Sequence, residues 1–368
     1  MLHNLFIFFI LGGKRDKELI LPLNDSLSAT LSTDEMHAKT TIMMSPDFKE
    51  DKMWLNGREE SLDNPRLQRC LKEMREKTKL HEGSTADWKV HICSKNNFPT
   101  AAGLASSAAG YACLVYTLAR LWDIEGDVSG MARQGSGSAC RSVLGGFVHW
   151  HRGELPTGED SIATQLVPNW PGLHVLILVV SDERKGTSST SGMQRSVETS
   201  ELLQHRVKHS VPPRIEAISK AIVERDFATF AAITMKDSNQ FHAVCLDTYP
   251  PAVYLNDVSH AIIRLVHQYN QECGKVKVAY TFDAGPNACL FMLAEDVPKV
   301  ATIFKNAFPP SAEQDMDFFR GSPIEPAIDG KTVEASSMGK LRYIIHTHVG
   351  EGPQEVENHL LDSAGLPI

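Results

Sequence analysis

A run of small residues from Asn96 to Gly110 constrains this chain more than any other feature of its sequence. Apolar residues follow it at the spacing of one helical face: Tyr111, Leu114, Val115, Leu118, Leu121 and Trp122. Glycine and alanine let a ligand approach the backbone, and the free N–H groups of a first helical turn favour an anion. The segment therefore predicts a phosphate-binding loop. The alternative is a small-residue loop that caps an ordinary core helix at Ser106 or Ser107, since the chain has neither a Walker A nor a G-x-G-x-x-G motif.

Length and composition predict a globular protein of two domains or of one two-lobed body. The chain has 368 residues, and domains hold roughly 150 residues each. Its apolar content of 42% and charged content of 22% are ordinary for such proteins. The net charge of -8 disfavours non-specific binding to nucleic acid, so an anionic substrate would need a local cluster of lysine and arginine.

The cysteines and the apolar N-terminus bear on the cellular compartment. Seven cysteines are scattered without a C-x-x-C motif, so we expect neither a disulfide framework nor a zinc site. Free cysteines are typical of a reducing compartment, and we therefore expect the protein in the cytosol. The apolar run Leu5–Leu11 is too short to span a membrane, and no other run approaches membrane length. A buried strand is predicted there rather than a signal peptide, because no Lys or Arg precedes the run and no A-x-A cleavage site follows it.

Periodicity and turn signals predict an α+β fold without strict alternation of strands and helices. Strands are expected at 18–23, 26–31, 40–44, 89–94, 146–150, 173–180, 276–282, 288–293 and 341–347. Helices are expected at 65–79, after Gly110, within 198–247, at 254–273 and at 297–308. Asn56-Gly57 predicts a hairpin, residues 309–336 an irregular excursion, and the residues after Gly350 a mobile tail.

Three further segments carry residues suited to chemistry. Gly135–Arg141 places serines and an arginine on a flexible backbone, where the guanidinium can bind a carboxylate or phosphate or simply lie on the surface. Lys14, Arg15 and Lys17 form a cationic patch that, taken alone, is more typical of a solvated face. Asp283 leaves an apolar strand into Ala284–Asn287, so it either hydrogen-bonds that turn or projects into a cleft as a base.

Together these segments resemble the mevalonate diphosphate decarboxylases of the GHMP kinase superfamily. The resemblance rests on several blocks in the family's order: Trp54–Glu60, Pro99–Ser107, Ser136–Ser142, Met235–His242 and Tyr280–Asn287. It implies a GHMP-kinase-like two-lobed α+β fold and a homodimer. The N-terminal lobe, residues 1–180, is expected to be ribosomal protein S5 domain 2-like, and the C-terminal lobe, residues 181–368, ferredoxin-like.

The same resemblance implies a reaction in the mevalonate pathway of isoprenoid and sterol biosynthesis. ATP-dependent decarboxylation of (R)-5-diphosphomevalonate would give isopentenyl diphosphate, ADP, phosphate and CO₂. The resemblance assigns Asp283 to the substrate's 3-hydroxyl and Arg141 to its carboxylate and to the developing cationic centre. Further substrate contacts fall on Lys14, Arg66, Ser136, Gly137, Ser138, Ala139, Cys140 and Thr190. The ATP phosphates, bridged by Mg²⁺ without protein ligands, fall on Pro99, Ala101, Ala102, Gly103, Leu104, Ala105, Ser106 and Ser107.

The first strand departs from the family pattern. The family ends that strand in Lys-Tyr-Trp-Gly-Lys-Arg, whereas this chain has Ile10, Leu11 and Gly12 in place of the first three residues and Leu5 in place of an earlier asparagine. We expect an alternative start or a mis-predicted first exon, and a form that folds but turns over slowly. Two alternatives remain: a non-catalytic binding protein built on a decayed enzyme, and a GHMP kinase that phosphorylates a small molecule and stops.

Overall fold

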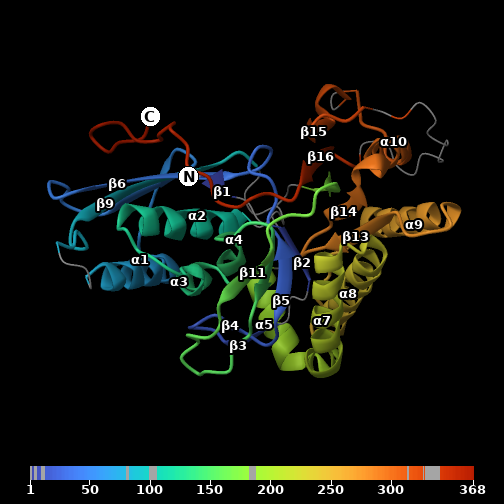
Figure 1. The fold of residues 1–368 in the computed structure, drawn as a ribbon, viewed down its shortest axis with the longest axis horizontal. Coiled ribbons are helices and arrows are strands. Elements are labelled where there is room, and N and C mark those ends of the chain that lie inside the picture. The colour runs from blue at the N-terminus through green and yellow to red at the C-terminus, as the bar shows by residue number, and fades with distance from the viewer. Residues whose placement is uncertain are drawn as a thin grey trace.

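The chain forms two lobes that meet at a central sheet (Figure 1). The structure, a computed structural model, describes residues 2–3, 6–9, 13–79, 83–98, 106–181, 188–312, 315–325, 327 and 340–368. Its three larger sheets and surrounding helices give the two-lobed α+β architecture that the sequence predicts.

The N-terminal lobe is a five-stranded sheet covered by helices. Its strand order is β1 (Leu2–His3), β6 (Ala38–Ser45), β9 (Lys89–Asn96), β7 (Lys52–Leu55) and β8 (Arg58–Glu60). Helices α1 (Pro65–Thr78), α2 (Ser106–Leu121) and α3 (Ser129–Gly135) share an apolar core with this sheet. The predicted hairpin is confirmed, because Asn56 and Gly57 join β7 to β8 with φ angles of 50° and 79°.

The central sheet has the strand order β11 (Ala163–Val167), β10 (Phe147–Trp150), β5 (Ser26–Ala29) and β2 (Phe6–Phe9), and all its pairs are antiparallel. The apolar N-terminal run therefore contributes a strand, as expected. Side chains alternate across β5: Leu27 and Ala29 lie in the largest apolar core, whereas Ser26 and Ser28 face the short helix α4 (Ala139–Ser142). A two-stranded ribbon, β3 (Lys14–Asp16) and β4 (Leu21–Pro22), precedes β5.

The C-terminal lobe is built on a sheet of order β13 (Val278–Phe282), β14 (Ala288–Leu293), β12 (Leu173–Val179), β16 (Tyr343–His348) and β15 (Phe319–Gly321). Its helices are α5 (Ser189–Thr199), α6 (Glu201–His205), α7 (Val211–Glu224), α8 (Phe227–Asp247), α9 (Asp257–Glu272) and α10 (Val297–Ala307), with a π-helical turn at Arg206–Ser210. Strand β12 pairs with β14 and β16 of this sheet, although it precedes the predicted lobe boundary at residue 180.

The structure corrects the expectations for two C-terminal segments. Residues 309–336 include a strand, β15, which pairs in parallel with β16 and was not predicted. The segment after Gly350 is not a mobile tail, because it packs against the N-terminal sheet. There the amide of Leu360 donates to Thr41 Oγ1 at 3.0 Å, His91 Nδ1 lies 2.8 Å from the carbonyl of Gly365, and Leu361 is buried.

The structure bears on the expectations about disulfide bonds and membrane-spanning helices. All seven cysteines are free thiols, so the prediction of no disulfide framework is confirmed. Among the described residues, none of the helices combines the length and apolarity needed to cross a bilayer.

Candidate active site

Arg141 is a fully buried cation that forms no hydrogen bond to a carboxylate of the described residues. Its Nε donates to Ser28 Oγ at 3.0 Å and its Nη1 donates to Ser26 Oγ, both on β5. The guanidinium carbon lies 5.2 Å from the ring centroid of Trp150. Its Nη2 is buried and makes no hydrogen bond within the described part of the chain, so one face of the fork remains available to a ligand.

Asp283 follows β13 directly, as the sequence suggested, and α8 positions the end of that strand. Ser238 Oγ accepts a hydrogen bond from the amide of Phe282 at 3.1 Å, and His242 Nε2 lies 3.3 Å from the Phe282 carbonyl. The block Met235–His242 thus fixes the backbone just before the carboxylate. Asp283 Oδ1 is buried and has no hydrogen-bond partner among the residues that the structure describes.

The two groups belong to one electrostatic environment. Burial lowers the pKa of Arg141, and two groups oppose this: Cys140 and then Asp283. Asp283 therefore lies close enough to stabilise the charged guanidinium, although the two residues come from opposite lobes. An unpaired donor and an unpaired acceptor whose charges influence each other are what a bound hydroxy acid would require.

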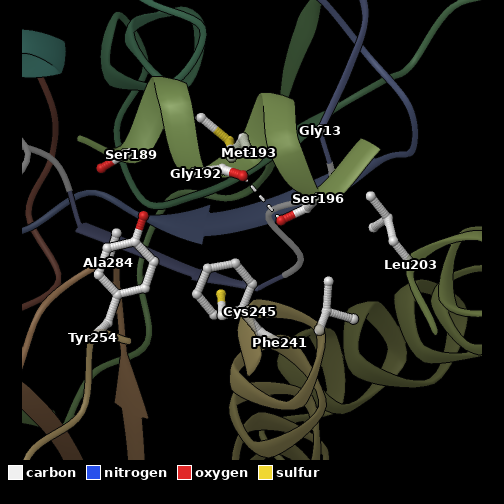
Figure 2. Close-up of a pocket in the computed structure, with 11 residues that line it drawn as sticks. Gly13, Ser189, Gly192, Met193, Ser196, Leu203, Phe241, Cys245, Tyr254 and Ala284 are labelled. Atoms are coloured by element: carbon white, nitrogen blue, oxygen red, sulfur yellow. Dashed lines mark hydrogen bonds between the residues drawn. The ribbon is translucent and has the colours of Figure 1, made fainter. Parts of the chain in front are cut away.

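A small apolar pocket adjoins Asp283. It is bounded by α5, by α8 and by Ala284, the residue after the carboxylate (Figure 2). Burial, then Cys245 and Asp283, raise the pKa of Tyr254 in its wall to about 12. Its lining residues are Gly13, Ser189, Gly192, Met193, Ser196, Leu203, Phe241, Val244, Cys245, Tyr254 and Ala284.

Gly13 closes this pocket from the N-terminal side, and only glycine fits there. A Cβ atom at Gly13 would lie 1.9 Å from Val197 Cγ2 of α5. Gly13 is also the glycine of the family's Lys-Tyr-Trp-Gly-Lys-Arg ending. The replaced positions Ile10, Leu11 and Gly12, like Leu5, lie outside the described residues.

A cluster of cations lies beside the start of β3. Burial, then the charges of Arg66 and Arg69, together lower the pKa of Lys14 to about 8. Three like charges gathered on a chain of net charge -8 favour a multiply charged anion. Sequence reasoning found Lys14 and Arg66 but missed Arg69. The signal was its spacing, because residues three apart on a helix share a face.

The other residues of the predicted cationic patch have structural roles. Arg15 Nη2 donates to the backbone carbonyls of Arg152 at 3.2 Å and Gly153 at 3.1 Å. Lys17 forms an exposed ion pair with Glu198 at 3.5 Å. Arg133 is a buried cation that the sequence reasoning also missed: its Nε and Nη1 find no hydrogen-bond partner within the described residues.

The remaining predicted substrate residues divide into two groups. Ser136, Ala139 and Cys140 are buried, and Gly137 and Ser138 are partly buried, in the bend between α3 and α4 that ends at Arg141. Burial raises the pKa of Cys140 to about 12, so its thiol is not a nucleophile at neutral pH. Thr190 is exposed, and its neighbour Ser189 lines the pocket instead.

The predicted phosphate loop lies largely outside the described residues. This applies to Pro99, Ala101, Ala102, Gly103, Leu104 and Ala105, whereas Ser106 and Ser107 form the start of α2. The first turn of α2 contains no acidic residue, so its free N–H groups suit an anion.

A buried arginine and a carboxylate that each keep one unpaired atom among the described residues, together with a cluster of cations around Lys14, are features of an enzyme that acts on a small anionic metabolite. Comparison with known proteins identifies the family. The chain matches the models of the diphosphomevalonate decarboxylase-like N-terminal domain at residues 7–163 and of the mevalonate 5-diphosphate decarboxylase C-terminal domain at residues 175–356. Diphosphomevalonate decarboxylase of Bos taurus is 53% identical over 373 residues, which cover 96% of this chain and 93% of that protein.

Solved structures agree. The crystal structure of a mevalonate 5-diphosphate decarboxylase matches with a TM-score of 0.87 and 44% identity, covering 99% of this chain and 97% of the other. A second, MDDEF in complex with MVAPP, AMPPCP and magnesium, has a TM-score of 0.75 and 28% identity, covering 95% of this chain and 96% of the other. The chain belongs to the diphosphomevalonate decarboxylase family, and the resemblance seen in its sequence is confirmed.

Proposed function

We propose that this chain catalyses the ATP-dependent decarboxylation of (R)-5-diphosphomevalonate to isopentenyl diphosphate, with release of ADP, phosphate and CO₂. The observation that carries the proposal is the shared environment of Arg141 and Asp283, each with an unpaired atom. A substrate that holds a tertiary hydroxyl and a carboxylate on neighbouring carbons can satisfy both groups at once.

The roles of the side chains follow from their environments. Asp283 accepts the proton of the 3-hydroxyl or orients that hydroxyl, since its Oδ1 has no competing partner within the described chain. Arg141 pairs with the carboxylate and stabilises charge as the carbon–carbon bond to CO₂ breaks. Because Ser26, Ser28 and Trp150 already hold the guanidinium, little reorganisation is needed during the reaction.

The phosphate groups of the ligands suit two other regions. The cluster of Lys14, Arg66 and Arg69 suits the 5-diphosphate of the substrate. The acid-free N-terminus of α2 suits ATP phosphates, and MDDEF was crystallised with AMPPCP and magnesium. ATP supplies a phosphoryl group that turns the tertiary hydroxyl into a leaving group, and Mg²⁺ neutralises phosphate charge.

One assay separates this proposal from its rivals. Purified protein is incubated with ATP, Mg²⁺ and diphosphomevalonate, and ADP, phosphate and CO₂ are measured together. We expect the three in equal amounts, and a fall of about 10²–10⁴-fold in turnover for Asp283→Asn. ADP without CO₂ would indicate a kinase, and a ligand-induced thermal shift without any turnover would indicate a binding protein.

The alternative, a non-catalytic binding protein, is supported by the first strand, where Ile10, Leu11 and Gly12 replace the family's residues. Restoring the family residues by Ile10→Lys, Leu11→Tyr and Gly12→Trp should raise turnover if those positions limit this form. A homodimer and a cytosolic location also remain predictions. Sedimentation equilibrium tests the first, and localisation of the tagged chain in cells tests the second.

A further inference from the structure

A second group of polar side chains lies away from Arg141 and Asp283, where β10 leaves the central sheet. Asp25, His149 and His151 each bring one ligand atom to within 4.8 Å of the others. His149 Nε2 lies 2.9 Å from Asp25 Oδ2, and the two imidazole rings stack with centroids 4.0 Å apart. The side chains are partly open to water, with 16% of His149 and 37% of Asp25 exposed.

Strand register builds this arrangement. Trp150 pairs with Ser26 and His149 with Leu27, so Asp25 falls opposite His151 at the continuation of the ladder. Residues 149 and 151 point to the same side because side chains alternate along a strand. The three side chains therefore converge through backbone pairing.

Neighbouring groups orient two of the three side chains. The amide of Arg152 donates to Asp25 Oδ1 at 2.8 Å, which leaves Oδ2 directed at His149. Thr164 Oγ1 on β11 lies 2.8 Å from His151 Nε2 and fixes that ring. Such outer contacts orient the ligands of protein metal sites.

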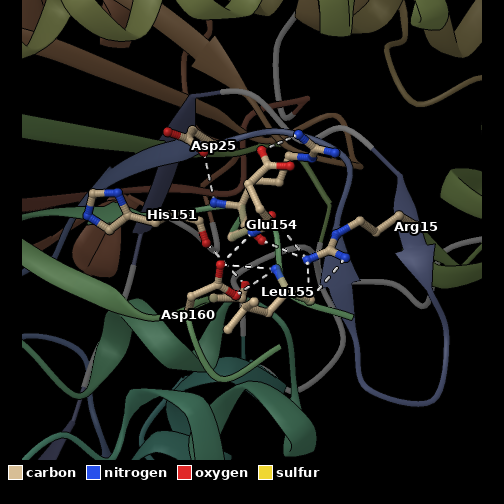
Figure 3. A network of polar contacts seen from close by, with 9 residues as sticks. Arg15, Asp25, His151, Glu154, Leu155 and Asp160 are labelled. Atoms are coloured by element: carbon tan, nitrogen blue, oxygen red, sulfur yellow. Dashed lines mark hydrogen bonds and ion pairs between the residues drawn. The ribbon is translucent and has the colours of Figure 1, made fainter. Parts of the chain in front are cut away.

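The nearby cations are turned to other partners. Arg152 Nη1 binds Glu154 at 2.8 Å, and Arg15 binds backbone carbonyls of the loop that follows His151 (Figure 3). Asp160 holds the same loop through the amides of Glu154 and Leu155.

We propose that Asp25, His149 and His151 bind a borderline transition-metal dication such as Zn²⁺ or Co²⁺. Two imidazoles and one carboxylate are a donor set that these ions prefer, whereas Mg²⁺ prefers oxygen ligands alone. Water fills the remaining coordination positions on the exposed side. His149 Nε2 and Asp25 Oδ2 are 2.9 Å apart as a hydrogen-bonded pair, so a bound ion would replace the proton between them.

This site is separate from the one that binds nucleotide and substrate. Ser26 and Ser28 point from β5 toward Arg141, whereas Asp25 and His149 lie on the other face of the same strands. A bound ion would therefore brace β5 against β10 behind the catalytic arginine. The sequence did not predict a zinc site, because zinc motifs are recognised by closely spaced ligands, whereas 124 positions separate Asp25 from His149.

The test is metal binding by the purified full-length chain, with its affinity tag removed and with metal stripped by chelation. Co²⁺ is titrated at pH 7.5 and followed by visible absorption at about 500–650 nm, which reports imidazole ligation. We expect one saturable Co²⁺ per chain, displaced by Zn²⁺, and a rise in Tm with bound metal. Asp25→Asn, His149→Gln and His151→Gln should each weaken binding by about tenfold or more.

His205→Gln provides the matched control. His205 and His209 are exposed one helical turn apart, with ring centroids 4.9 Å apart. Among the described residues, they are not part of a group of three metal-ligating side chains. This variant should bind Co²⁺ like the parent. The proposal is overturned if no saturable site appears, if all three cluster variants retain parental affinity while folded by circular dichroism, or if His205→Gln abolishes the absorption. His151→Gln keeps the Asp25–His149 contact, so it guards against a folding defect in the other variants.

Discussion

Arg141 in the N-terminal half and Arg206 in the C-terminal half are both 0% exposed, yet the protein treats their charges differently. Arg206 binds Asp237 through two hydrogen bonds of 2.9 and 2.7 Å, and its Nη1 also donates to Gln240 at 2.8 Å. Each guanidinium leaves one buried nitrogen without a hydrogen-bond partner in the described structure, Nη2 in Arg141 and Nε in Arg206, but Arg141 is held by two serine hydroxyls and a tryptophan ring rather than by a carboxylate.

The difference separates a charge that holds the fold together from a charge that is kept for a ligand. The carboxylate of Asp237 neutralises the charge of Arg206 and so offsets the free-energy cost of burying it. Arg141 keeps its charge without such a neutralising bond, which favours an anionic guest at that position. Asp283 shows the same feature with opposite sign, because its Oδ1 is buried without a hydrogen bond in the described part of the chain.

The largest expected effect is on stability, from Arg206→Met. This change removes the fully buried cation that binds the buried Asp237 through two hydrogen bonds, and leaves the partly exposed Arg214 at 2.9 Å from that carboxylate. We expect a loss of about 3–5 kcal/mol in the free energy of unfolding, measured by urea denaturation.

The double variant Arg206→Met with Asp237→Leu should recover most of that loss, since no fully buried charge then remains, and Arg214, which loses its contact with Asp237, is partly exposed to water. Lys220→Met is a control on the surface of α7, where an ion pair with Glu224 at 3.9 Å is exposed. It should change stability by less than about 0.5 kcal/mol. Equal losses for Arg206→Met and Lys220→Met would remove the basis of the comparison.

Arg141→Gln should act on catalysis and leave the fold intact. Losing a preorganised charge at the reacting carboxylate is expected to lower kcat by about 10²–10³-fold, or roughly 2.7–4 kcal/mol. Stability should stay level or rise, because an unneutralised buried charge is removed. CO₂ release and urea denaturation measure the two quantities, and a loss of stability as large as that of Arg206→Met would contradict the distinction.

Raising the pH above about 8 should weaken binding of the diphosphate substrate. The pKa of Lys14 is lowered to about 8 by burial and by Arg66 and Arg69, whereas a bound anion favours the charged form. The complex therefore takes up a proton above that pH. Affinity is full below pH 8 and falls by up to about tenfold per pH unit above it, until the pKa of Lys14 in the complex is reached.

Calorimetric titration with diphosphomevalonate at several pH values measures this dependence. Lys14→Arg keeps its charge and should remove the pH dependence. Lys17→Met, next to it on the surface and paired only with Glu198 in the described structure, should leave the pH dependence unchanged. A pH profile that Lys14→Arg does not alter would assign the titration to another group.

The smallest expected effect comes from Ser28→Ala. It removes the acceptor that holds Arg141 Nε at 3.0 Å, so we expect a loss of about 0.5–1.5 kcal/mol, seen in kcat more than in KM. Ser94→Ala is the matched control, because Ser94 Oγ is buried 3.0 Å from Thr40 Oγ1 in the N-terminal sheet. We expect Ser94→Ala to lower the free energy of unfolding about as much as Ser28→Ala does, without lowering kcat. A change in KM alone for Ser28→Ala would argue that the serine does not orient the guanidinium.

The sequence predicted local structure well where a local signal exists. Alternation and apolar runs located β9, β12 and β14, and Asn56-Gly57 located the hairpin. The strand β15 was missed because its three residues, Phe319–Gly321, become a strand only by pairing with β16. The C-terminal segment was missed for a similar reason, since its contacts are with Thr41 and His91, far away in the chain.

Arg141, Asp283, Lys14 and Arg66 could be selected from sequence because each lies in a block that resembles the family. That the charge of Asp283 influences Arg141 could not be read from the chain, because 142 positions separate the two and only folding brings them near each other. Arg69 adds charge to the same cluster as Lys14, and Asp25 meets His149 across two strands. None of these partners is adjacent in sequence.

By itself, the sequence determined most of the longer secondary structure elements, the mixed α+β class and the family, because side-chain periodicity, turn residues and motif blocks are local properties. Only the tertiary structure decided which charges are neutralised and which are left for a ligand. The reason is physical: the energy of a buried charge depends on its distance from solvent and from groups brought close by folding, as Arg206 with Asp237 and Arg141 with Ser28 show.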